Sequence, residues 1–137
     1  MGLEPLGSSP GERWLERRHE VSYKQIGLLR KGLFADTFEV ACPWSEVARV
    51  YNAVRQAISS EALSMAHFSH AYSEGCALYF SMTGRKDSYE RTWQRALFAA
   101  DAAGATLSHH HGVGRLKVPL IYFGNLVLLS MLFDNQL

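Results

Sequence analysis

The chain has 137 residues, enough for one domain with a modest hydrophobic core and too few for two comfortable domains. Hydrophobic residues make up 47% of it and charged residues 20%, a composition typical of a globular protein. Because 14 Lys and Arg oppose 13 Asp and Glu, the net charge is +1, and no nucleic-acid partner is expected.

Cysteine usage and the N-terminus bear on the compartment. Cys42 and Cys76 have neither the spacing of a metal site nor that of a disulfide framework. Residues 1–5 show no basic region followed by an apolar one, which a secretory signal would have. We therefore expect a reducing, cytoplasmic location.

The first half of the chain predicts a lead segment, a strand and a helix. Residues 1–12 are rich in Gly, Pro and Ser and predict a linker. An entry helix is expected after it, so that linker and helix together occupy residues 1–35. Residues 36–42 alternate polar and apolar side chains, as a half-buried strand does. Apolar residues then recur at helical spacing through 45–59, namely Val47, Val50, Tyr51, Val54 and Ile58.

The second half predicts a hairpin, a helix and a last strand. Residues 64–72 and 76–82 are strand-like and are joined by a short turn that contains Gly75. A helix is expected over 88–103, and a short strand over 106–111.

The order strand, helix, strand, strand, helix, strand predicts a ferredoxin-like α+β sandwich, the split βαβ fold, with an antiparallel sheet and helices on one face. We place this domain at residues 36–119, after a linker and entry helix at 1–35 and before an apolar tail at 120–137. The apolar run 120–132 is too short to cross a bilayer, which takes about 20 residues. It predicts either a core helix or an exposed end that drives self-association or association with a membrane surface.

The run Ser-His-His-His-Gly-Val-Gly-Arg at 108–115 is the most informative stretch. Histidine can take or give a proton near neutral pH, and two glycines allow the main chain to approach a ligand closely. Catalysis or ligand contact is one interpretation, and a metal-binding tract or a structural role are the alternatives. On a strand, His109 and His111 would point to one face and His110 to the other, so the three imidazoles could not bind one ion together. We therefore expect no metal site.

The predicted hairpin places a second polar group nearby. His67 falls roughly opposite Tyr79, and pairing of the last strand beside the hairpin would bring residues 109–111 towards Tyr79. A tyrosine near imidazoles can donate or accept a proton if its pKa is lowered. The alternative is that Tyr79 is an ordinary half-buried strand aromatic.

Residues 66–80, the motif at 108–115 and the Asp-Thr-Phe-Glu-Val run at 36–40 resemble the C-terminal domain of FAD-linked oxidases of the vanillyl-alcohol oxidase superfamily. Within it, the Ser-His-His-His-Gly-Val-Gly motif is similar to the alkyldihydroxyacetonephosphate synthase branch. The resemblance covers about residues 5–119.

The resemblance implies an FAD-dependent oxidoreductase or transferase that replaces the acyl chain of acyl-dihydroxyacetone phosphate by a fatty alcohol, in ether-lipid biosynthesis, without net redox change at FAD. It implies catalytic roles for Tyr79, His109, His110 and His111. It also implies cofactor contacts from His110, His111, Gly112 and Gly114, with a small-molecule or lipid substrate.

The FAD-binding domain of that family is not in these residues, so we expect a fragment of a larger two-domain flavoenzyme, with a tail that diverges from the family pattern after Pro119. Two rival interpretations stay open. One is a relative of FAD-dependent 2-hydroxyacid dehydrogenases, in which His67 would be a metal ligand; Tyr79 and His110 stand where that branch has its other ligands. The other is an inactive fragment that acts only by interaction.

Overall fold

A computed structural model describes residues 5, 7–109 and 111–118. The elements follow one another in the order α1 (Ser9–Arg17), α2 (Glu20–Arg30), β1 (Leu33–Pro43), the 3-10 turn η1 (Trp44–Glu46), α3 (Val47–Ile58), β2 (Ala62–Ala71), β3 (Gly75–Arg85), the 3-10 turn η2 (Lys86–Ser88) and α4 (Tyr89–Ala102). The apolar tail after residue 118, for which we expect association, lies outside the described residues. No helix among the described residues is long and apolar enough to cross a membrane.

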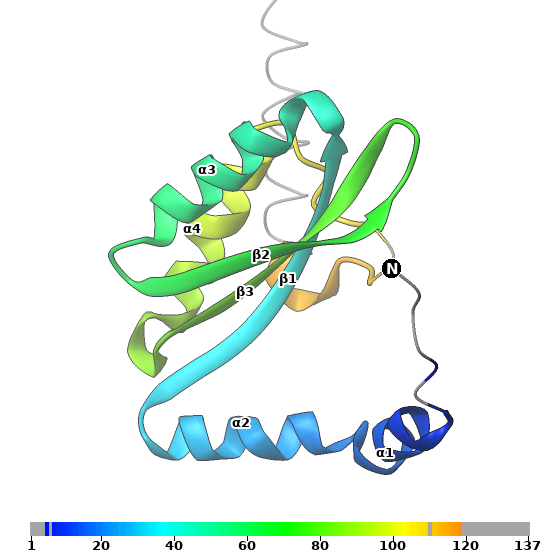
Figure 1. Ribbon diagram of the computed structural model, residues 1–137. Helices are drawn as coiled ribbons and strands as arrows, with labels where there is room; N and C mark the ends of the chain where they lie inside the picture. Colours follow the sequence, from blue (N-terminus) through cyan, green and yellow to red (C-terminus); the bar gives the residue numbers. More distant parts are fainter. Residues whose placement is uncertain (1–4, 6, 110, 119–137) are drawn as a thin grey trace, which may run out of the picture.

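The sheet has the strand order β1-β3-β2, with β3 antiparallel to both neighbours (Figure 1). This is the arrangement that the split βαβ pattern predicts, so the α+β fold with an antiparallel sheet is confirmed. The strands extend beyond the expected limits, because the ladder runs from Leu33 opposite Arg85 to Pro43 opposite Gly75. The hairpin of β2 and β3 is also as expected, with an irregular register between Phe68 and His70.

The expected fourth strand over 106–111 is wrong beyond its first residue. Thr106 forms one isolated antiparallel bridge with Ala41, in which the two backbones exchange hydrogen bonds of 2.7 and 3.1 Å. After Thr106 the chain no longer pairs with β1. Leu107 is buried in the core, whereas His109 and His111 both contact Glu39. An alternating strand could not place both histidines and the leucine in this way.

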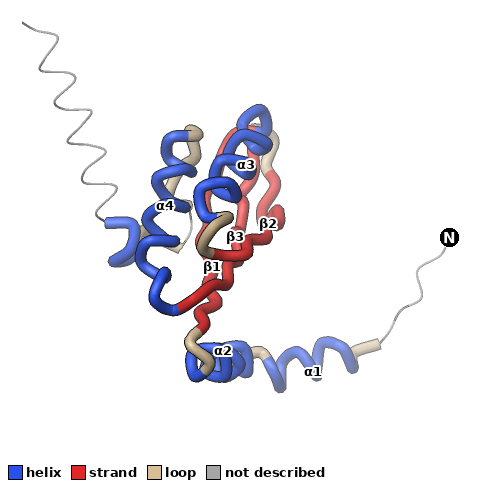
Figure 2. The backbone as a smooth tube through the Cα atoms, turned by 90° about the vertical axis from the view of Figure 1, so that its left-hand side faces the viewer, coloured by secondary structure: helices blue, strands red, loops and turns tan. Residues whose placement is uncertain are grey.

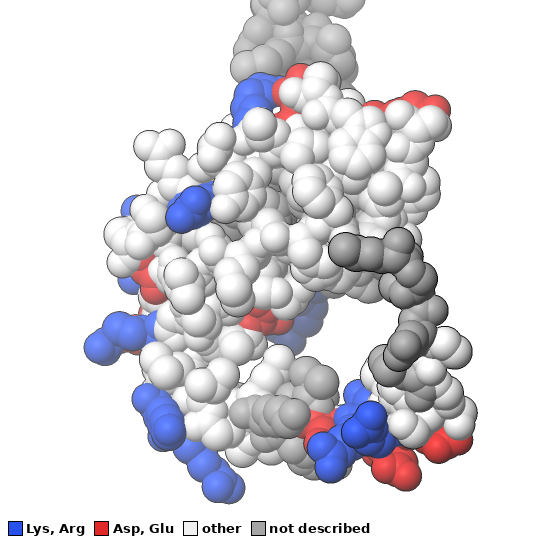
Figure 3. All heavy atoms as spheres, viewed as in Figure 1, with Lys and Arg blue, Asp and Glu red and all other residues white. Residues whose placement is uncertain are grey.

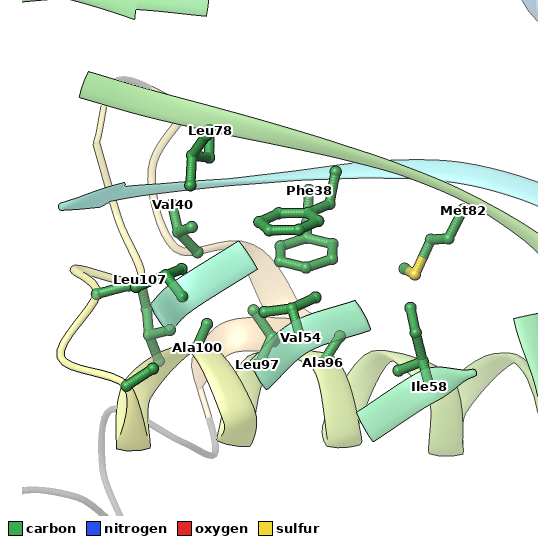
Figure 4. Packing of buried hydrophobic residues seen from close by; sticks show 14 of the residues in the cluster. Phe38, Val40, Val54, Ile58, Leu78, Met82, Ala96, Leu97, Ala100 and Leu107 are labelled. Atoms are coloured by element: carbon green, nitrogen blue, oxygen red, sulfur yellow. The ribbon is translucent and has the colours of Figure 1, made fainter. Parts of the chain in front are cut away.

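Helices α3 and α4 cover one face of the sheet (Figure 2). Even-numbered residues of β1 and β3 point at them, and Phe38 stacks on Phe80 with ring centroids 5.1 Å apart. From the helices, Val54 and Leu97 are fully buried against these rings (Figure 4). The helix predicted over 45–59 is thus confirmed at its buried face, Val50, Val54 and Ile58.

The N-terminal helices lie apart from this sandwich. Helix α1 has no buried residue, and α2 contacts β1 at the end of the sheet, below it in Figure 1. Residues 9–12, which composition assigns to a linker, form the first turn of α1, where Pro10 costs no hydrogen bond. Lys and Arg gather on this lower part of the surface, whereas the area over β2 is largely uncharged (Figure 3).

The two cysteines face each other on neighbouring strands. Cys42 is opposite Cys76 in the β1–β3 ladder, and both are free and buried. Burial, with the neighbouring Cys76 second, raises the pKa of the Cys42 thiol to about 11, so at neutral pH it is protonated and unreactive. The cytoplasmic location expected from the cysteines stays a prediction.

Leu97→Ala is expected to lower the free energy of unfolding by about 2–5 kcal/mol, because it opens a cavity in the centre of the core. Phe98→Ala, one position along α4 where the side chain is 56% exposed, is the control and should cost much less. Urea unfolding of both variants measures the difference. Equal losses would mean that α4 does not bury its Leu97 face.

Candidate functional site

The site forms on the face of the sheet that α3 and α4 leave uncovered. Odd-numbered residues of β1 and β3 point to this face, because neighbouring side chains on a strand alternate. The register puts Glu39 of β1 directly opposite Tyr79 of β3, and Tyr79 directly opposite His67 of β2. Three strands therefore place three polar side chains in one row.

Glu39 is the most buried member of this row, although α3 and α4 lie on the other face of the sheet. Its side chain is 1% exposed, and each carboxylate oxygen meets a different imidazole. Nδ1 of His109 lies 3.1 Å from Oε1, and Nδ1 of His111 lies 2.7 Å from Oε2. The segment after α4 thus closes over the carboxylate and excludes water from it.

Tyr79 lies beside the same cluster. Its hydroxyl is 3.0 Å from Nε2 and 3.2 Å from Nδ1 of His111, and the two rings meet edge to face at 5.4 Å. The ring of His67 is 5.2 Å from that of Tyr79, so the neighbour relation expected from the hairpin is confirmed. The histidines reach Tyr79 by another route than expected, because their segment passes along β1 and not beside the hairpin.

A second tyrosine meets the other imidazole. The hydroxyl of Tyr72, at the end of the hairpin, lies 3.3 Å from Nε2 of His109. The backbone of Tyr72 is fixed by Trp44, whose Nε1 donates a hydrogen bond of 2.9 Å to the carbonyl oxygen of Tyr72. His70 adds a third ring, 6.0 Å from His109 and 6.4 Å from Tyr72.

The environment of Tyr79 favours the neutral phenol. Burial is the first cause that raises its pKa, and the hydrogen bond and negative charge of Glu39 follow. The lowered pKa that the sequence analysis required for proton transfer by Tyr79 is wrong, because the pKa is raised. Tyr79 is therefore equipped to donate a proton at neutral pH, and not to act as a phenolate base.

The glycines of the motif form an open turn after the histidines. Gly112 and Gly114 have φ values of 70° and 59°, in the left-handed region that favours glycine, and no atom of the described residues lies within 4 Å of where their Cβ atoms would stand. A cavity of about 200 Å³ lies beside this turn and is bounded by His111, Trp93 and Lys117. The buried ammonium of Lys117 donates a hydrogen bond of 3.0 Å to the backbone oxygen of Glu39.

Of the expected site residues, the structure brings Tyr79, His109 and His111 together, and His110 lies outside the described residues. Gly112 and Gly114 lie beside them. Sequence reasoning missed Glu39, Lys117 and Tyr72. The alternation of residues 36–42 had placed Glu39 on the polar face, which is correct, but nothing local showed that a distant segment buries it. Among the described residues no group of three or more His, Cys, Asp or Glu is arranged to hold a metal ion.

The sequence of this chain matches one known protein family. The sequence profile described as "FAD linked oxidases, C-terminal domain" matches residues 8–126. The alkyldihydroxyacetonephosphate synthase of Dictyostelium discoideum is 30% identical over 127 residues, covering 83% of this chain and 21% of that protein. The one of Trypanosoma brucei brucei is 27% identical over 131 residues, covering 86% and 21%. The chain therefore spans about a fifth of the length of these relatives.

Solved structures show the same fold. A crystal structure of alkyldihydroxyacetonephosphate synthase superposes with a TM-score of 0.59 at 22% identity, covering 69% of this chain and 19% of that one. A second structure of such a synthase gives a TM-score of 0.58 at 20% identity, with the same coverage.

The fold and the site define the class: an α+β domain that presents a histidine and tyrosine cluster on the open face of its sheet. The chain belongs to the family of FAD-linked oxidase C-terminal domains, and the relatives that it resembles over most of its length are alkyldihydroxyacetonephosphate synthases.

Glu39→Gln is expected to lower the pKa of Tyr79, because it removes the negative charge that favours the neutral phenol. The pKa should stay above its ordinary value, since the burial that is the main cause remains. NMR titration of tyrosine labelled with ¹³C at Cζ measures it. Glu46→Gln, on the helix side beside Arg49, is the control and should leave the titration of Tyr79 unchanged.

Proposed function

We propose that this chain is the substrate-side part of an FAD-dependent enzyme that makes an ether bond, exchanging the acyl chain of an acyl-dihydroxyacetone phosphate for a fatty alcohol. The observation that carries the proposal is the contact between the Tyr79 hydroxyl and His111, on the open face of a domain from the FAD-linked oxidase family. The alkyldihydroxyacetonephosphate synthases that match more than four-fifths of the chain support the choice of reaction.

In this proposal Tyr79 and His111 move the proton that the exchange requires. The pKa of Tyr79 is raised, so Tyr79 carries its proton at neutral pH, and Nε2 of His111 lies 3.0 Å from the hydroxyl, close enough to receive or replace that proton. A positioned acid or base of this kind contributes about 10²–10⁴-fold in rate. His109, with Tyr72 at its Nε2, lies on the same face and would contact the alcohol or the leaving acid.

The open face fits one side of a flavin site. His111 and the turn of Gly112 and Gly114 border unfilled space, and the left-handed glycines leave the main chain accessible to a flat ring. These residues would contact FAD, together with His110 of the same motif. FAD supplies an electron-accepting ring system next to the substrate, and the residues of this chain bind, orient and exchange protons around it.

The proposal is tested by replacing the matching segment of the Dictyostelium synthase with residues of this chain. The hybrid is expected to bind FAD and to exchange acyl for alkyl groups. Tyr79→Phe should reduce the rate about 10²–10⁴-fold with flavin content unchanged. Tyr51→Phe, which removes a hydroxyl that contacts Arg55 on α3, is the matched control and should keep the rate.

The double variant of Tyr79→Phe and His111→Ala should lose little more than either single variant, because groups on one proton path act as a unit. Single-turnover rates and melting temperatures separate a chemical loss from an unfolding one. A flavin-loaded hybrid that keeps full activity with Tyr79→Phe would exclude this strand from the chemistry.

The 137-residue chain alone should bind FAD only weakly, with a dissociation constant above about 1 µM. The reason is that a site on an open sheet face covers one side of a ligand, whereas tight pockets bury most of the ligand surface. Titration followed by flavin fluorescence measures it. Submicromolar binding would mean that the residues of this chain build a complete flavin pocket.

A further inference from the structure

The imidazoles of His109 and His111 both contact the carboxylate of Glu39. Oε1 of Glu39 faces Nδ1 of His109 at 3.1 Å, and Oε2 faces Nδ1 of His111 at 2.7 Å. Both rings therefore present the same nitrogen to the same side chain. An ionised carboxylate offers only lone pairs, so an unprotonated nitrogen at 2.7 or 3.1 Å would be repelled, and each Nδ1 therefore carries a proton, although the approach of His111 to Oε2 is not in hydrogen-bond geometry.

The proton at Nδ1 decides the chemistry of the other ring nitrogen. A neutral imidazole has one donor and one acceptor nitrogen, so a ring protonated at Nδ1 has its lone pair at Nε2. Nε2 of His109 lies 3.3 Å from the hydroxyl of Tyr72. The hydroxyl of Tyr79 lies 3.0 Å from Nε2 and 3.2 Å from Nδ1 of His111, and of these two nitrogens only Nε2 has a lone pair once Nδ1 is protonated.

The charge at the centre is compensated from the opposite side. The ammonium of Lys117 is buried and lies against the backbone oxygen of Glu39 at 3.0 Å; burial lowers its pKa, and the negative charge of Glu39 partly offsets that shift. With Lys117 as counter-charge, neither imidazole has to be protonated to neutralise Glu39. A neutral ring is the form in which Nε2 accepts a proton.

We infer that Glu39 is a positioning residue that fixes the Nδ1–H form of both His109 and His111 and so directs two carboxylate–imidazole–tyrosine relays, one to Tyr79 and one to Tyr72. The inference rests on the proposed function of the site, and it adds to that function a second proton-transfer arm, through His109 and Tyr72. Carboxylate partners of histidine fix ring tautomer and orientation in this way at metal sites, where their loss costs about 10–100-fold.

The tautomers can be measured on the 137-residue chain without flavin or activity. Long-range ¹H–¹⁵N correlation spectra of ¹⁵N-histidine-labelled chain, at a pH where the rings are neutral, distinguish protonated from unprotonated ring nitrogens. His109 and His111 should each show a protonated Nδ1 and an unprotonated Nε2, with assignments from His109→Gln and His111→Gln. A protonated Nε2 in both rings of the wild-type chain overturns the inference, even if no variant folds.

Glu39→Gln sharpens the test, because an amide offers one acceptor oxygen and one donor nitrogen in place of two acceptors. One ring should keep its Nδ1 proton, and the other should change to the Nε2–H form. The control is Glu46→Gln, which removes a carboxylate paired with Arg49 and should change neither ring. Unchanged tautomers in folded Glu39→Gln would show that Glu39 does not set them.

In the flavin-loaded hybrid, Glu39→Gln should lower kcat about 10–100-fold with little change in KM, since Glu39 acts through the histidines and does not touch substrate. Tyr72→Phe should lower kcat in the same direction if the second arm operates. A wild-type hybrid that binds FAD but lacks activity contradicts the proposed function and leaves the tautomer result standing. An active hybrid with normal kcat in Glu39→Gln contradicts the positioning role alone.

Discussion

The burial of one carboxylate, that of Glu39, is the constraint on which the site depends. A carboxylate removed from water costs several kcal/mol unless it is paired and hydrogen-bonded. Here His109, His111 and Lys117 compensate it, and all three come from the segment that follows α4. The carboxylate therefore specifies where this segment must lie, and the segment in turn keeps the carboxylate dry.

The division of labour between the two faces of the sheet follows from strand alternation. Even-numbered residues such as Phe38 and Phe80 build the core under the helices, and odd-numbered residues such as Glu39 and Tyr79 build the site on the other face. A substitution on one face can thus change packing with little effect on the chemistry, and the reverse also holds. Within residues 7–109 and 111–118, helices α3 and α4 cover only the core face of the sheet.

Local sequence pattern was enough to predict the sheet, the two covering helices and the pairing of His67 with Tyr79, because each depends on periodicity within a short window. The chemistry of histidine singled out the run at 109–111, the predicted hairpin placed Tyr79 near it, and the family resemblance added their catalytic roles. The prediction of a fourth strand over 106–111 was wrong. His109 and His111 both contact the Glu39 carboxylate of β1, and this long-range interaction outweighs the local strand propensity. For Glu39 the alternation gave only its side of the strand, because burial by a segment about 70 positions away leaves no local signal.

The histidine segment is held at both ends by the backbone of the same strand. At its start, Thr106 exchanges two hydrogen bonds with Ala41, and at its end Lys117 donates one to the carbonyl of Glu39. The two attachment points are two residues apart on β1, so the segment between them is a closed loop whose position follows that of β1. Between these anchors the glycines permit the left-handed turns that return the chain to β1 after His111. The strand that carries the carboxylate thus also carries the loop that brings the imidazoles to it, and the relative position of acid and base depends on one structural element and not on the packing of two.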